Sequence, residues 1–322
     1  MKEFTKARVF PYAVTAFAAL ILILARNIVP ISWIDPIIRV LIYLLFGMST
    51  NILIGYVGMI PMGQAVFVGI VSYSFTIMMA KYGIGILPAL LLSLMLSVLL
   101  SVFIGFFCLK GGEGFAVGFI YMGFNTLFNL IVTKVKYFGL EAGMSGAKRF
   151  AGLSENSDYL VFVTIVVAIS FMIIYLILHS PMATVFKGIR ENPERVTYFG
   201  VNIFNMRLIA FCISAFFTSV AGLLYSMYLR GAYPNMSSNG FSLQMLMMCV
   251  IGGMYYFTGP IFGSIFICLL FSRLPNLTIY WQSIFGVLLI TVCLGMQGGI
   301  LGFFDEKIRK PIQRKRLENK RC

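Results

Sequence analysis

Charged side chains gather in one short stretch in the second half of this 322-residue chain. It reads SPMATVFKGIRENPERVTYFGVN, residues 180–202, and the segments on both sides are almost purely apolar. Chemistry on a nucleotide is excluded, because the chain has no Gly-Lys dipeptide and therefore no phosphate-binding GxxxxGK[ST] loop. His179 is the only histidine, so neither a histidine metal cluster nor a Ser-His-Asp set is available. No enzyme site is expected in this chain.

Two proline-marked signals predict short helices inside the charged stretch. Ser180-Pro181 places a capping residue before a proline at the first helical position, which predicts a helix running to about Arg190. Asn192-Pro193 repeats the same signal at the end of this helix. The stretch is therefore expected to be two rigid, capped helices that lie in the cytoplasm.

The second of these helices, 193–199, has the features of a docking element. Gly200 can adopt the left-handed conformation that ends a helix, and Val196 and Phe199 are spaced to share one apolar face. A docking helix and a solvated helical loop both remain open. The residues assigned to the candidate element are Arg190, Glu191, Asn192, Pro193, Glu194, Arg195, Val196, Tyr198, Phe199 and Gly200.

Glycine and proline interrupt two other apolar segments. They read GYVGMIPMGQAVFVGIVSY at 55–73 and IGGMYYFTGPIFGSIF at 251–266. At membrane depth, irregular backbone is tolerated only where protein or a water-filled cavity satisfies it, and paired breaks of this kind point to a solute path. Ordinary turns with small-residue helix packing are the alternative. The candidate path residues are Asn51, Gly55, Gly58, Pro61, Gly63, Gln64, Gly252, Gly253, Gly259, Pro260 and Gly263.

The composition identifies the class of protein that must position these residues. The chain is 60% hydrophobic and 11% charged, whereas a soluble domain carries roughly 25% charged residues. We therefore expect an all-α polytopic membrane protein with about eight to ten transmembrane segments, two of them broken or short, in a single domain. The segments are expected near 9–29, 36–54, 63–80, 85–109, 115–133, 159–178, 204–229, 241–252, 260–272 and 277–299.

The distribution of Lys and Arg predicts an orientation. With both termini in the cytoplasm and ten crossings, residues 180–202 and the basic tail 303–322 lie inside, together with most of the 25 Lys and Arg residues. The net charge of +14 then reflects topology and anionic lipid, and no nucleic acid is expected as a partner. The segment 9–29 is expected to be a retained first span. The six cysteines form no CxxC pair, so no zinc site or disulfide framework is indicated.

Polar groups inside the expected spans are mainly uncharged. Asn51, Gln64, Asn125, Asn129 and Gln244 stand out, and no span centre carries an obvious Asp, Glu, Lys or Arg. Ion-coupled carriers usually keep ionisable residues in the bilayer. This pattern therefore lowers the expectation of ion-coupled secondary transport.

Four motifs resemble the permease subunits of branched-chain amino acid ABC importers, specifically the LivM-like half, over about residues 37–305. PMGQAVFVGIVSY resembles the family's S-L-G-[HQ]-A-A-F-x-G-x-G-A-Y segment, and IGGMYYFTGPIFGSIF its G-G-x-G-x-x-x-G-P-x-x-G-A segment. KGIRENPERVTYFGVN resembles its R-E-[ND]-x-x-A-A-x-x-x-G-[IV]-[ND] motif, and GMQGGILG its R-P-Q-G-[LI]-[LF]-G end. The chain departs from the pattern at Pro61, Val66, Gly295 and Met296. On the outer side, EAGMSG at 141–146 replaces T-G-G-x-[ND]-G, and this change affects the expected solute more than the others do.

The resemblance implies a transport subunit in the cell membrane that binds no cofactor itself. A second, LivH-like permease, two ATPase subunits that bind ATP and Mg, and an extracytoplasmic solute-binding protein would be its partners, together with membrane lipid. The element at 190–200 would be the coupling helix of the importer. Branched-chain or other small amino acids would be the solute. Import of urea, a nucleoside or a simple sugar is an alternative, and a self-contained channel or secondary carrier is another.

Overall fold

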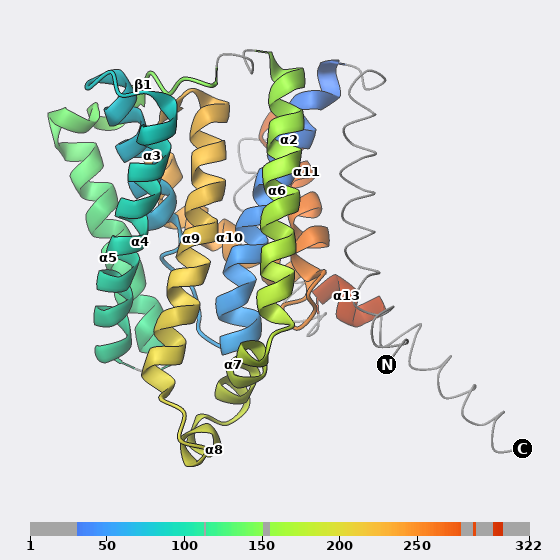
Figure 1. The fold of residues 1–322 in the computed structure, drawn as a ribbon. Helices are drawn as coiled ribbons and strands as arrows, with labels where there is room; N and C mark the ends of the chain where they lie inside the picture. Colours follow the sequence, from blue (N-terminus) through green and yellow to red (C-terminus); the bar gives the residue numbers. More distant parts are fainter. Residues whose placement is uncertain (1–30, 113, 151–154, 278–285, 288–298, 305–322) are drawn as a thin grey trace, which may run out of the picture.

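The computed structural model describes residues 31–112, 114–150, 155–277, 286–287 and 299–304. This part of the chain is a helical bundle with one pair of two-residue strands (Figure 1), which confirms the all-α polytopic class. The spans expected near 9–29 and 277–299 and the tail 303–322 lie outside the described residues, apart from a few positions. The orientation of the chain in the membrane stays a prediction.

Within the described residues, five helices are long and apolar enough to cross a membrane. Each has at least 20 residues, and 20 residues at 1.5 Å per residue give about the 30 Å thickness of a bilayer core. They are α2 (Ile31–Asn51) with its π-helical extension η2 (Ile52–Val57), α4 (Ile86–Lys110), α5 (Phe115–Lys134), α6 (Asn156–Leu178) and α9 (Ile203–Leu229).

Shorter elements connect these helices. The apolar ones are α3 (Ala65–Ala80), α10 (Asn239–Gly252) and α11 (Gly259–Leu277). The others are η3 (Lys136–Phe138), η4 (Leu140–Ala142), β1 (Met144–Ser145), α7 (Pro181–Glu191), α8 (Pro193–Tyr198), β2 (Gly231–Ala232), η5 (Pro234–Ser237) and α13 (Gly299–Phe304). Figure 1 places β1 at one end of the bundle and α7 and α8 at the other.

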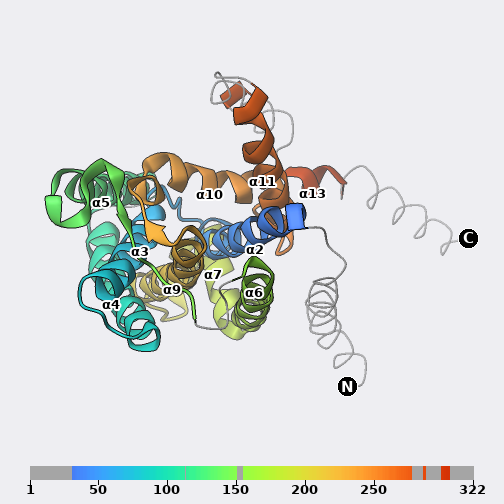
Figure 2. The ribbon, with the colours of Figure 1, turned by 90° about the horizontal axis from the view of Figure 1, so that it is seen from above.

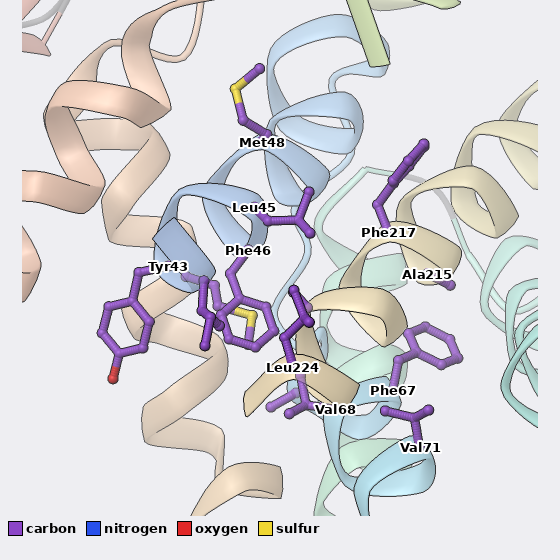
Figure 3. Close-up of a cluster of buried hydrophobic side chains, with 14 of the residues drawn as sticks. Tyr43, Leu45, Phe46, Met48, Phe67, Val68, Val71, Ala215, Phe217 and Leu224 are labelled. Carbon is purple, nitrogen blue, oxygen red and sulfur yellow. The ribbon is translucent and has the colours of Figure 1, made fainter. Parts of the chain in front are cut away.

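Helices α2 and α9 form the centre of the bundle. Seen along the bundle, α9 lies beside α3 and α4, while α2 lies beside α6, α10 and α11 (Figure 2). Phe46 from α2, Phe67 from α3 and Leu224 from α9 are buried in the shared core (Figure 3). The outer helices α4, α5 and α6 are much less buried, so their outward apolar faces are suited to lipid.

A stripe of small residues fixes α4 against α9. Buried Ala89, Ser93, Ser97, Ser101 and Gly105 repeat every four residues along one face of α4. Small residues let two helices approach closely, and their hydroxyl groups can bond across the contact. Ser97 Oγ lies 2.5 Å from Ser219 Oγ of α9. The opposite face carries exposed leucines and phenylalanines, as expected of a lipid-facing surface.

The loop between α5 and α6 is tied to the end of α9. β1 pairs antiparallel with β2, which follows α9 directly. Arg149 donates from Nε to the Met227 carbonyl at 3.0 Å and from Nη2 to the Tyr228 carbonyl at 3.1 Å. A cation at these last carbonyls satisfies the helix end and interacts well with the helix dipole. Burial lowers the pKa of Arg149 from its usual value, but guanidinium stays charged in proteins.

Candidate translocation and coupling sites

A buried polar network joins the first broken segment to the bundle centre. Gln64 Nε2 donates to Ser214 Oγ at 2.8 Å and to Thr218 Oγ1 at 2.5 Å, and Tyr121 OH donates to Gln64 Oε1 at 3.0 Å. Ser49 Oγ lies 2.9 Å from Thr218 Oγ1. All five residues are buried. Gln64 therefore holds the start of α3 at mid-depth, where Ser214 and Thr218 lie on α9.

Replacing Gln64 with leucine is expected to destabilise the protein. The change keeps the volume similar but leaves Tyr121 OH and the α9 hydroxyls short of a partner, which costs about 1–3 kcal/mol. Thermal unfolding of the purified protein would measure it. Tyr121→Phe removes a single bond of the same network and should cost less, and equal stability of all three proteins would contradict this role.

The first broken segment comprises η2 and the turn that follows it. Asn51 is buried at the start of η2, and among the described residues its two side-chain amide atoms have no hydrogen-bond partner. Gly58 ends η2 with φ +79°, which favours glycine. Buried Pro61 lies in the turn. A Cβ on Gly63 would lie 2.2 Å from the Tyr121 carbonyl, so glycine lets this turn pass against α5.

The second broken segment is a tight crossing of α10 and α11. A Cβ on Gly252 would lie 1.9 Å from the Gly259 carbonyl, and one on Gly263 would lie 1.8 Å from the Met248 carbonyl. Gly253 has φ +113° and starts the turn between the helices. Pro260 lies against Gly47 of α2, whose added Cβ would come within 3.1 Å of the Pro260 Cβ. These glycines bring two backbones into contact, and their role in a solute path stays a prediction.

Arg190 connects α7 to both broken segments. Its Nη1 donates to the Gly55 carbonyl of η2, and its side chain lies over Gly58, where an added Cβ would be 2.7 Å from Arg190 Cγ. Its guanidinium carbon also lies 5.1 Å from the ring centroid of Tyr255, in the turn between α10 and α11. Lys187 of α7 lies 5.3 Å from the Tyr56 ring of η2. π-Helical turns occur often at functional sites, and here α7 contacts one directly.

The short helix α8 has the predicted start, and it ends at Tyr198, one residue before the predicted end. Asn192 Oδ1 accepts the Arg195 amide at 3.1 Å, and Gly200 has φ +77°. Ser180 occupies the cap position of α7, but its hydroxyl donates to the Ile177 carbonyl and makes no cap bond. Val196 and Phe199 do not form one exposed apolar face, because Val196 packs against the core while Phe199, directly after α8, faces solvent.

Two aromatic rings of this element face solvent. Val196 packs beside Gly188 of α7, whereas Tyr198 and Phe199 are 88% and 86% exposed. Glu191, Glu194 and Arg195 are exposed around them, and Pro193 is partly buried at the helix start. Helices α7 and α8, which carry these residues, project from one end of the bundle (Figure 1). This aromatic surface is held on the same rigid pair of helices as Arg190.

A cavity of about 750 Å³ opens between α2, α9, α10 and α11. Its polar lining residues are Tyr43, Tyr225, Tyr233, Asn235, Ser238 and Gln244. None of the candidate path residues lines it. Gln244 was visible in the sequence as an amide inside a short apolar segment, whereas the tyrosines gave no signal, because their rings meet only through the fold. Groups of His, Cys, Asp or Glu that could hold a metal do not occur within the described residues.

Comparison with known proteins supplies the family context. A family model described as branched-chain amino acid transport system / permease component matches residues 32–293. The high-affinity branched-chain amino acid transport system permease protein LivM of Salmonella typhimurium is 22% identical over 316 residues, covering 87% of this chain and 74% of that protein. Escherichia coli LivM is 23% identical over 290 residues, covering 81% and 68%. No solved structure was found to match the chain.

Proposed function

This chain belongs to the branched-chain amino acid transport system permease family, and on that premise we propose that it is a membrane subunit of an ATP-driven ABC importer. It is a multi-pass membrane protein. Its solutes would be branched-chain or other small amino acids, since both LivM relatives belong to a high-affinity branched-chain amino acid transport system. The chain would form half of the solute path and would itself bind neither ATP nor Mg.

The observation that carries the coupling proposal is the pair of contacts made by Arg190. On one side of the α7–α8 unit lie the exposed rings of Tyr198 and Phe199. On the other side, Arg190 reaches Gly55 of the first break and Tyr255 of the second. A motion imposed on α8 by a partner would therefore be passed to both broken segments. A short capped helix with exposed aromatic groups is well suited to a partner's groove.

The partners follow from this arrangement. Two ABC ATPases would bind ATP and Mg and receive α8 in the cytoplasm, and a LivH-like permease would complete the path. An extracytoplasmic solute-binding protein would deliver the solute at the opposite end, where β1 and the altered 141–146 segment lie. The basic tail and the charge of 180–202 support cytoplasmic termini in the cell membrane.

The docking role is tested by placing charge on the exposed rings. The double variant Tyr198→Asp/Phe199→Asp is expected to lose its ATPases on purification, because removing aromatic anchors from an interface costs about 2 kcal/mol or more. Solute uptake in proteoliposomes should fall with it. Tyr82→Asp is the matched control for ATPase recovery, since Tyr82 is 67% exposed just after α3 ends, at the β1 end of the bundle and away from α8. Normal ATPase recovery and uptake in the double variant would rule out α8 as the docking element.

A further inference from the structure

Helix α10 begins inside the bundle, at about half its depth. Asn125, near the middle of α5, donates to Asn239 Oδ1 at 2.6 Å at the start of α10. The Phe241 ring packs 6.2 Å from the ring of Tyr43, near the middle of α2. The Ala65 amide, at the start of α3, donates to Ser242 Oγ at 2.9 Å. The starts of α3 and α10 therefore meet at mid-depth, as in a discontinuous membrane helix.

The start of α10 opens into the cavity and carries partial positive charge. Ser238 and Gly240 line the cavity at this point. Ser238 Oγ caps this turn by accepting the Phe241 amide at 3.2 Å. The remaining amides at the start of the helix and the helix dipole make this end favourable for an anion. α10 has 14 residues, enough for an established dipole. A Cβ on Gly240 would meet nothing closer than Ser238 Oγ at 3.8 Å, so this backbone borders open space.

Gln244 supplies an independent observation in the same cavity. It lies one turn beyond Gly240, lines the cavity and is only 7% exposed. Its Nε2 has no hydrogen-bond partner among the described residues. A buried donor without a partner costs about 1–3 kcal/mol. Nε2 itself is closed off from solvent, so an acceptor supplied by a ligand would remove that cost once the amide turns toward the cavity.

The rest of the lining matches a neutral molecule that has an apolar part. No charged side chain lines the cavity within the described residues. The nearby cation Arg39 donates to Tyr228 OH at 3.1 Å, outside the lining. Tyr225 and Phe241 stack at 5.8 Å, and such aromatic faces attract an ammonium group. Leu229, Met247 and Phe271 provide apolar surface.

We propose that this cavity is a solute site of the permease itself, in which the carboxylate of a zwitterionic α-amino acid binds at the start of α10 and to Gln244 Nε2. The ammonium group faces the aromatic rings, and the aliphatic side chain lies against the apolar surface. The site rests on the proposed amino acid import, and it assigns this subunit a binding role beyond passing solute onward. A cavity of this volume is within the usual range for small-molecule sites.

The first test separates a binding role of Gln244 from a structural one. In the assembled importer, Gln244→Leu is expected to lower the initial rate of ATP-driven leucine uptake about tenfold or more, as befits loss of a hydrogen bond to a charged group. Its melting temperature should stay equal or rise, because the variant removes a buried donor without a partner. If Gln244 had only a structural role, Gln244→Leu would lower both the uptake rate and the melting temperature. Gln244→Glu should lower uptake further by repelling the carboxylate.

The outcomes are distinguishable. Uptake within twofold of the wild type for both Gln244 variants would overturn the site and leave the proposed import intact. A wild-type importer that takes up no amino acid would instead contradict the proposed import itself.

A second test probes the cavity directly. In a background with Cys212, Cys293 and Cys322 replaced by alanine, the Gly240→Cys thiol is expected to react with a water-soluble thiosulfonate in the importer without its binding protein. Leucine should slow this reaction severalfold, and 3-methylbutylamine, which lacks the carboxylate, should not. Glu141→Cys, exposed on the loop between α5 and α6, is the control and should react equally with or without leucine. Equal protection by the amine, or none by leucine, would refute carboxylate recognition here.

Discussion

An importer carrying Arg190→Met is expected to bind its ATPases and hydrolyse ATP, but to import almost no solute. The reason is geometric: methionine keeps the length of the side chain but loses the donor to the Gly55 carbonyl and the cation over the Tyr255 ring. The docking surface of Tyr198 and Phe199 is unchanged. A hydrogen bond from a charged donor contributes about 1.5–3 kcal/mol, so the two broken segments would no longer follow α7 together.

The measurement is the ratio of solute molecules imported to ATP hydrolysed in proteoliposomes. Arg190→Lys should recover part of this ratio, because lysine keeps the charge but lacks the planar fork that reaches two partners at once. Lys110→Met is the control, since Lys110 is exposed at the end of α4. Its ammonium group lies over the Phe106 ring of the same helix, 4.6 Å from the ring centroid. A wild-type ratio for Arg190→Met would show that coupling passes through other residues.

The sequence predicted the features that depend on local chemistry. The proline and asparagine signals at Pro181, Asn192 and Pro193 specify α7 and α8 because capping involves only neighbouring residues. The glycines and prolines of the two breaks were visible for the same reason. Gln64 could be singled out as an amide in an apolar segment, because a polar group there must find partners.

Other features depend on contacts between distant segments and left no local signal. The helix expected to end near residue 54 continues as η2 to Val57. Within η2, the Gly55 carbonyl accepts a hydrogen bond from Arg190, which lies 135 residues away in the chain. Tyr43 and Tyr225 meet only when α2 and α9 pack together. Val196 is turned toward Gly188 of α7 while Phe199 faces solvent, and this difference depends on how α8 packs against α7.

The largest loss of folded protein is expected from a side chain at the crossing of α10 and α11. At Gly263, even the Cβ of alanine would lie 1.8 Å from the Met248 carbonyl, and a backbone group cannot turn aside as a side chain can. The two helices would have to separate, which exposes the turn that Arg190 contacts and moves Pro260 away from α2. Overpacking of a core typically costs about 1–3 kcal/mol, occasionally more, and a backbone clash belongs at the upper end.

Gly263→Ala should therefore lower the yield of monodisperse protein in detergent and its melting temperature, and Gly263→Leu should abolish both the yield and uptake. Gly123→Ala is the matched control: Gly123 lies on the exposed face of α5 with nothing within 4 Å of an added Cβ. That variant should be neutral or stabilising by up to about 1 kcal/mol, because alanine favours a helix more than glycine does. If Gly263→Ala folds and melts like Gly123→Ala, the two backbones do not touch, and the second break is an ordinary turn between loosely packed helices.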